Sequence, residues 1–169
     1  MKRFLRNITF FSLFFLTAYV AVVYLFGRLM PADMRPNIFY NKEMFGSTNN
    51  MLSDLSRQQR VDILIVGASD AYRSYDTRIF SDNGYSVFNA GSSSQTPMQT
   101  YLLLKDNIER LSPRLVLYEV SPICFELDGV ESTTDLMLNG YSHKSIFPLI
   151  FRNPDIHLVN SFLFDFADR

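Results

Sequence analysis

The chain has 169 residues, of which 16 are Lys or Arg and 17 are Asp or Glu. Three of the basic residues, Lys2, Arg3 and Arg6, precede a long uncharged stretch, and the chain from residue 27 onward carries a net charge of −4. This distribution excludes a cytosolic soluble protein, a multi-pass transporter and a nucleic-acid-binding protein that depends on a strongly basic domain, so we expect no nucleic-acid partner. A domain of this size folds without disulfides, and the single cysteine, Cys124, has no partner for one.

Residues 8–26 form a run of 19 residues without a charge. A helix of this length spans about 28 Å, which nearly matches the hydrocarbon core of a bilayer. A basic leader followed by such a run is typical of a cleaved signal peptide or of a retained signal anchor. The length of the run and the lack of an Ala-x-Ala-like cleavage site favour a transmembrane signal anchor over residues 8–30.

The charges beside this segment predict its orientation. Basic residues are the only charged ones in the leader, residues 1–7, and positively charged flanks stay on the cytoplasmic side. We therefore expect a single-pass protein of the cytoplasmic membrane, with the N-terminus inside and the rest of the chain outside. The lipid bilayer is then a partner of the protein.

After the anchor, the residue composition of the chain changes once, near residue 61. Residues 31–60 contain two prolines and a polar cluster, which predicts a juxtamembrane tether with a short helix over residues 51–56. From residue 61 onward, apolar runs alternate with turn residues. We expect one α/β domain over residues 61–169, with an apolar helical tail over residues 129–169.

Three short apolar runs in this domain have the composition of buried strands. They cover residues 63–66, 87–88 and 115–118, and each is followed by small or polar residues. The first run is mostly β-branched, which is typical of a strand that is buried on both faces.

Helices are predicted between these strands. Thr96 is placed to cap a helix, Pro97 suits its first turn because an N–H has no helical partner there, and Gln99 completes a capping box. Residues 70–80, between the first two strands, are expected to be helical in part. The alternation of strands and helices predicts a parallel sheet with right-handed crossovers.

Small and polar residues follow each predicted strand. Ser69 follows the first strand, Asn89 and Gly91 follow the second, and Glu119 and Ser121 follow the third. Ligands of open parallel sheets bind beyond the carboxyl ends of the strands, so we expect these residues to gather at one edge. A hydroxyl there, with the N–H groups of Ser69 and Gly91 directed at the same point, is what a serine nucleophile and an oxyanion pocket require.

Two of these segments resemble the first two sequence blocks of the SGNH (GDSL-like) hydrolases, especially their membrane-anchored cell-envelope branch. The segments are VGASDAYR, residues 66–73, and NAGSSSQT, residues 89–96. The resemblance covers residues 61–122 and implies a three-layer, flavodoxin-like α/β fold. By position, it implies that Ser69 is the nucleophile and that the Gly91 N–H helps to bind the oxyanion.

Two later motifs of that family are absent. The third strand is followed by EVSP instead of Gly-x-Asn-Asp, and no Asp-x-x-His occurs in the chain. His143 and His157 are the remaining candidates for the catalytic base, although neither has a carboxylate three residues before it. We therefore expect an incomplete sheet, and interpret the chain as the N-terminal part of a longer hydrolase-like protein or as a shortened relative.

Several of these residues also have structural interpretations. Ser69 is equally suited to cap the following helix. Glu119, at the end of the third strand, is a candidate to orient a base or to bind a substrate hydroxyl. Cys124 has no His or Cys at metal-ligand spacing, so we expect a free thiol, no metal site and no cofactor. The aromatic residues of the tail, including Phe162 and Phe164, are expected to form core, with an acyl-chain groove or contact with the bilayer as the alternative.

Two functions remain from this reasoning. The first is a membrane-anchored serine esterase or acyltransferase that acts on ester groups of cell-envelope glycans or lipids, with an incomplete catalytic set in this chain. The second is a non-catalytic, membrane-anchored module that binds a partner in the cell envelope. A nucleotide-binding Rossmann half is disfavoured, because no Gly-x-Gly-x-x-Gly follows the first strand and the expected location is outside the cytoplasm.

Overall fold

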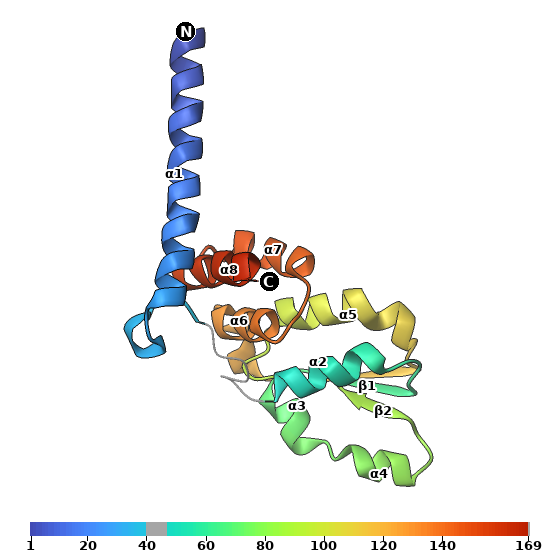
Figure 1. The fold of residues 1–169 in the computed structure, drawn as a ribbon. Helices are drawn as coiled ribbons and strands as arrows, with labels where there is room; N and C mark the ends of the chain where they lie inside the picture. Colours follow the sequence, from blue (N-terminus) through green and yellow to red (C-terminus); the bar gives the residue numbers. More distant parts are fainter. Residues whose placement is uncertain (40–46, 169) are drawn as a thin grey trace. The chain divides into compact units, whose positions relative to one another are not determined.

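A computed structural model describes residues 1–39 and 47–168 of the protein (Figure 1). It divides into two compact units, which we name the anchor unit (Met1–Tyr40 and Asp155–Arg169) and the sheet unit (Asn41–Pro154). The sequence predicts one domain over residues 61–169, whereas the structure groups the last part of this range with the N-terminal helix.

The anchor unit contains α1 (Lys2–Leu29), the 3-10 turn η1 (Ala32–Met34) and α8 (Ile156–Asp168). α1 is long and apolar enough to cross a membrane, in agreement with the predicted span. The helix ends at Met30, whose backbone is extended. Met30 precedes Pro31, and the residue before a proline is sterically disfavoured in a helix.

α8 packs against the last third of α1. Phe164 is buried and forms a small core with Val23 and Ile38. Gly27 permits this packing, because a Cβ atom at that position would overlap the Phe164 ring. Phe164 of α8 is thus buried against α1, which explains why α8 belongs to the anchor unit.

The sheet unit is built on three parallel strands, β1 (Ile63–Val66), β2 (Val87–Asn89) and β3 (Leu115–Tyr118). Their order is β2-β1-β3, so β1 is central and all four of its residues are buried. The predicted strands and their parallel arrangement are confirmed. A strand in the middle of a parallel sheet is covered on both faces, and the apolar run of β1 meets that requirement.

Helices and one 3-10 turn complete the sheet unit. They are α2 (Thr48–Arg57), α3 (Ser69–Ser74), α4 (Thr77–Asp82), α5 (Pro97–Leu111), η2 (Pro122–Phe125), α6 (Val130–Leu138) and α7 (His143–Arg152). In Figure 1, α5 lies on one side of the sheet, and α3 and α4 lie on the other. The fold is therefore α/β with a small parallel sheet and mostly helices.

The predicted cap of α5 is present. The Thr96 hydroxyl accepts a hydrogen bond from the Met98 N–H, at 3.3 Å, and the Gln99 side chain accepts one from the Thr96 N–H, at 3.2 Å. Two N–H groups of the first turn thus gain partners that the helix itself does not supply. This cap starts α5 directly after the loop that contains Gly91, and so limits the length of that loop.

Candidate functional site

The residues after the three strands gather at the carboxyl edge of the sheet, as predicted. Backbone hydrogen bonds continue beyond the strands: the Ala90 N–H donates to the Ile65 carbonyl at 2.8 Å, and the Glu119 N–H donates to the Val66 carbonyl at 2.9 Å. The Ser92 N–H also donates to the Gly67 carbonyl, at 3.2 Å. The turn after β1 is therefore held from both neighbouring strands.

Glu119 lies across the end of β1. Its Oε2 atom accepts a hydrogen bond from the Ala68 N–H at 3.2 Å. The backbone of Gly67 has a φ of +142°, a region that L side chains rarely adopt. Glu119 therefore contacts the peptide segment that leads directly into Ser69, and the glycine at 67 leaves room for it.

Ser69 is the first residue of α3 and is half-buried. The N-cap of α3 is Ala68, and no side chain caps this helix. Within the described residues, no hydrogen bond to the Ser69 hydroxyl is formed. The alternative in which Ser69 caps its own helix is thus not realised, and its hydroxyl is not occupied by a structural contact.

Gly91 lies beside α3, but its N–H group is engaged. The Gly91 N–H donates to Asn89 Oδ1 at 3.0 Å, and Asn89 Nδ2 donates to the Ala71 carbonyl at 2.8 Å. The Asn89 carboxamide therefore links the loop after β2 to the helix that begins at Ser69. A Cβ atom on Gly91 would lie 2.8 Å from Ala71 Cβ, so this loop and α3 are in close contact.

The sequence did not predict the role of Cys124 at this edge. Cys124 lies in η2 and is buried. Burial raises the pKa of its thiol, and the negative charges of Glu119 and Asp70 raise the pKa further, whereas a hydrogen bond with Ser121 opposes the rise. Cys124 follows Glu119 by five residues in the sequence, and in η2 it lies where the charges of Glu119 and Asp70 act on its thiol.

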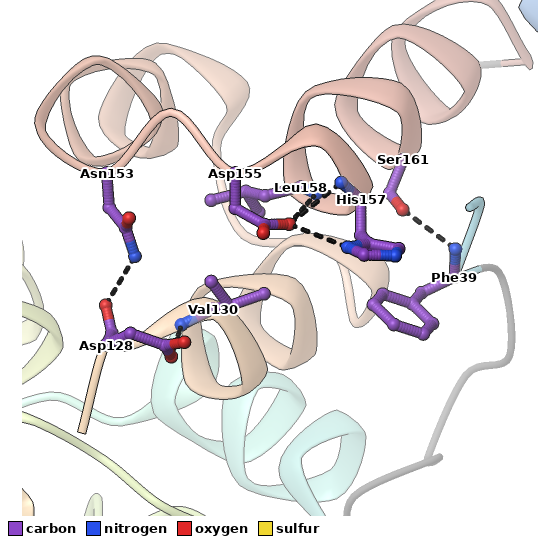
Figure 2. Close-up of polar contacts among 8 residues, drawn as sticks. All are labelled: Phe39, Asp128, Val130, Asn153, Asp155, His157, Leu158 and Ser161. Atoms are coloured by element: carbon purple, nitrogen blue, oxygen red, sulfur yellow. Dashed lines mark hydrogen bonds and ion pairs between the residues drawn. The ribbon is translucent and has the colours of Figure 1, made fainter. Parts of the chain in front are cut away.

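The two histidines are held by other contacts. His143 begins α7, which packs on α6, and no hydrogen bond joins it to Ser69 within the described chain. His157 belongs to the anchor unit, where its Nδ1 atom lies 3.1 Å from Asp155 Oδ1 (Figure 2). Its ring stacks on Phe39, with 5.6 Å between the ring centres.

Figure 2 also shows why Asp155 stands two residues before His157. Asp155 Oδ1 accepts hydrogen bonds from the backbone N–H groups of His157, at 2.8 Å, and Leu158, at 3.2 Å. These bonds cap the first turn of α8. Asp155 therefore stands two residues before His157 because it caps α8, and this explains why the pair does not have the Asp-x-x-His spacing.

Among residues 1–39 and 47–168, no group of three or more His, Cys, Asp or Glu side chains is placed to hold a metal ion. Comparison of the chain with models of protein families, with curated proteins and with solved structures finds no match. The function therefore has to be argued from the geometry at the carboxyl edge of the sheet.

Proposed function

We propose that this chain is a membrane-anchored serine esterase or acyltransferase of the SGNH type. In this proposal α1 anchors it in the cytoplasmic membrane, and the sheet unit acts outside on ester groups of cell-envelope glycans or lipids. The supporting observation is the position of Ser69 directly after a turn held by both neighbouring strands, with a hydroxyl to which no described residue forms a hydrogen bond. The strand order β2-β1-β3 is also that of the first three strands of flavodoxin-like sheets, whose ligands bind between β1 and β3.

The reaction begins with attack of Ser69 Oγ on the ester carbonyl carbon. The serine proton passes to a base, the carbonyl oxygen becomes an oxyanion, and the alkoxide then leaves with that proton to give an acyl-serine. Water or an acceptor hydroxyl completes the transfer. The Ser69 N–H is one donor to the oxyanion, and the Gly91 N–H becomes the second when substrate displaces the Asn89 carboxamide from it.

The base in this proposal is Glu119. A serine hydroxyl is a weak nucleophile until a base accepts its proton, and Glu119 already accepts a hydrogen bond from the residue before Ser69. A carboxylate that takes up the proton also loses its charge, so it no longer opposes the oxyanion that forms beside it. The low basicity of a carboxylate predicts slow turnover.

The second candidate is a non-catalytic, membrane-anchored module that binds a partner in the cell envelope. The hydrogen bond from the Gly91 N–H to Asn89 favours it, because a free oxyanion pocket would leave this donor open. The two functions differ in their need for the serine hydroxyl. In the binding module, Ser69→Ala leaves the activity in cells intact, whereas Gly91→Val abolishes it by crowding Ala71.

Covalent labelling with a fluorophosphonate separates the two candidates. The full chain, folded in detergent, should be labelled, and Ser69→Ala should lose the label. Ser74→Ala is the matched control, because Ser74 lies at the exposed end of the same helix. Glu119→Gln should slow labelling by at least about tenfold. A folded wild-type chain that stays unlabelled would rule out the esterase and leave the binding module.

A further inference from the structure

α8 contacts a part of α1 that the hydropathy pattern assigns to the membrane. The Tyr19 hydroxyl donates a hydrogen bond to Asn160 Oδ1, and Arg28 forms an ion pair with Asp168 at 3.3 Å. Between these contacts, the rings of Tyr24 and Phe164 lie 6.0 Å apart. The contacts of α8 with α1 therefore extend from Tyr19 to Arg28, the first charged residue after the apolar run, and Figure 1 shows α8 running across this end of α1.

The depth of this contact follows from helix geometry. Arg28 is the first charge after the apolar run, so it marks the boundary of the bilayer. Tyr19 is nine residues earlier, which places it about 14 Å from that boundary along the helix. If the span shifted by one turn towards the N-terminus, Tyr19 would still lie about 8 Å inside. An element that contacts α1 over this range must lie at least partly within the same layer.

The outward surface of α8 suits that position. At 100° per residue, the residues that contact α1 form one stripe, which contains Asn160, Phe164 and Asp168. An arc of about 120°, centred roughly 140° from this stripe, is apolar throughout. Its outward members, which we name the outward face, are Ile156, Val159, Phe162 and Phe166, whereas Leu163 packs against the core of Val23, Ile38 and Phe164.

The side chains of the outward face are accessible to a lipid phase. Ile156 is 52% exposed and Phe166 is 65% exposed, and the rings of Phe162 and Phe166 stack with 6.2 Å between their centres. Two buried polar side chains of α8 have partners inside the anchor unit: Asn160 accepts a hydrogen bond from the Tyr19 hydroxyl, and Ser161 accepts one from the Phe39 N–H at 2.8 Å. Satisfied polar groups behind an apolar surface are what an interfacial environment requires.

We propose that α8 is an interfacial helix, whose outward face lies among the lipids of the leaflet that α1 leaves near Arg28. The proposal rests on the membrane anchoring included in the proposed function, but not on its chemistry. α8 itself carries no Lys or Arg, so its insertion depends on apolar contact and does not require anionic lipids. One consequence is that α1 and α8 hold the chain at the membrane surface together.

Site-directed fluorescence in vesicles tests this proposal. The full chain, with Cys124→Ala, would carry one new cysteine labelled with NBD and be reconstituted in phosphatidylcholine vesicles. Three positions give the comparison: Phe166 on the outward face, Leu13 within the apolar run, and Ser81 on the exposed surface of α4. We expect doxyl-labelled lipids to quench Leu13→Cys and Phe166→Cys, each with a blue-shifted emission, and to leave Ser81→Cys unquenched.

Each outcome bears on the proposal. Quenching of Leu13→Cys without quenching of Phe166→Cys would overturn the interfacial helix while α1 remains a membrane span. Failure of both to be quenched would refute the anchoring as well. Ile156→Cys, on the same face, repeats the measurement should Phe166→Cys not fold. Fluorophosphonate labelling tests Ser69 in the sheet unit, whereas the NBD measurements test the anchor unit. A chain without serine chemistry would therefore give the same NBD results.

Discussion

The backbone of Gly67 lies so close to Glu119 that a Cβ atom on Gly67 would fall 2.7 Å from Glu119 Cβ. These two residues follow adjacent strands, β1 and β3, and the Ala68 N–H donates to the Glu119 carboxylate between them. This contact closes the edge of the sheet on which Ser69 lies. Residue 67 therefore tolerates no side chain, for two independent reasons: the contact with Glu119 and its positive φ.

We expect Gly67→Ala to lower the free energy of unfolding by on the order of 3 kcal/mol, from backbone strain and overpacking together. Gly84→Ala is the control, because Gly84 also has a positive φ, +83°, but has open space around it. Strain alone should cost that variant about 1 kcal/mol. Urea unfolding in detergent, followed by circular dichroism, measures both. Equal losses of unfolding free energy in Gly67→Ala and Gly84→Ala would contradict a close contact between Gly67 and Glu119.

A second prediction concerns the loop after β2. Gly91→Ala should destabilise the sheet unit by about 1–3 kcal/mol, because the new methyl group would lie 2.8 Å from Ala71 Cβ. Ala71→Gly removes that methyl group, at a helix-propensity cost of about 1 kcal/mol. In the double variant we expect part of the Gly91→Ala loss to be recovered, which a double-mutant cycle of unfolding energies detects. Strict additivity would show that the two positions do not touch.

A third prediction concerns the Cys124 thiol. Burial first, and then the Glu119 charge, raise its pKa, and removal of a nearby negative charge favours the thiolate. Glu119→Gln should therefore lower the pKa of Cys124, as measured from the pH dependence of its reaction with iodoacetamide. Glu126→Gln removes a charge from an exposed residue near Cys124 in the sequence, and should leave the profile in place. If the pH profile is unchanged in Glu119→Gln, the Glu119 charge does not influence the pKa of the Cys124 thiol.

The fourth prediction concerns Asp135, a buried carboxyl group in α6. Burial raises its pKa, with a smaller contribution from the charge of Glu131, although hydrogen bonds with Thr48 and Asn139 oppose the rise. A carboxyl group with a raised pKa stabilises the fold fully below its unfolded pKa of about 3.9. That stability is lost as the pH rises through the native pKa.

Asp135→Asn lacks this titration. Relative to the wild type, the variant should therefore gain stability as the pH rises from about 4 towards neutrality. Denaturant unfolding at several pH values measures the difference, and Asp54→Asn, the same substitution on the exposed face of α2, serves as the comparison. A constant difference between Asp135→Asn and the wild type would contradict the raised pKa.

Local signals in the sequence predicted most elements of the sheet unit. The strands at 63–66 and 115–118 have the predicted bounds, and β2 is one residue longer than its apolar run. α5 begins at the cap that Thr96 and Gln99 form. Each of these signals depends on neighbours within a few residues, so a single sequence contains it.

The candidate site was predictable in its location and not in its contacts. Parallel strands bring the residues after them to one edge, so the neighbourhood of Ser69, Gly91 and Glu119 followed from the parallel direction of the strands. The bond that occupies the Gly91 N–H depends on the rotamer of Asn89, which sequence patterns do not specify. The tail was assigned to the α/β domain because its apolar spacing shows that α8 is amphipathic, but not which surface covers it.

The sequence by itself determined the apolar span near the N-terminus, the positions of the three strands, the start of α5 and the parallel direction of the sheet. Tertiary structure alone decided that α8 packs on α1 through Phe164, and that Glu119 reaches the turn before Ser69. The physical reason is the distance along the sequence between the residues that interact. Helix caps, turns and hydrophobic periodicity involve residues that are close in the chain, whereas these two contacts join residues 51 or more positions apart, whose pairing depends on how complete surfaces fit together.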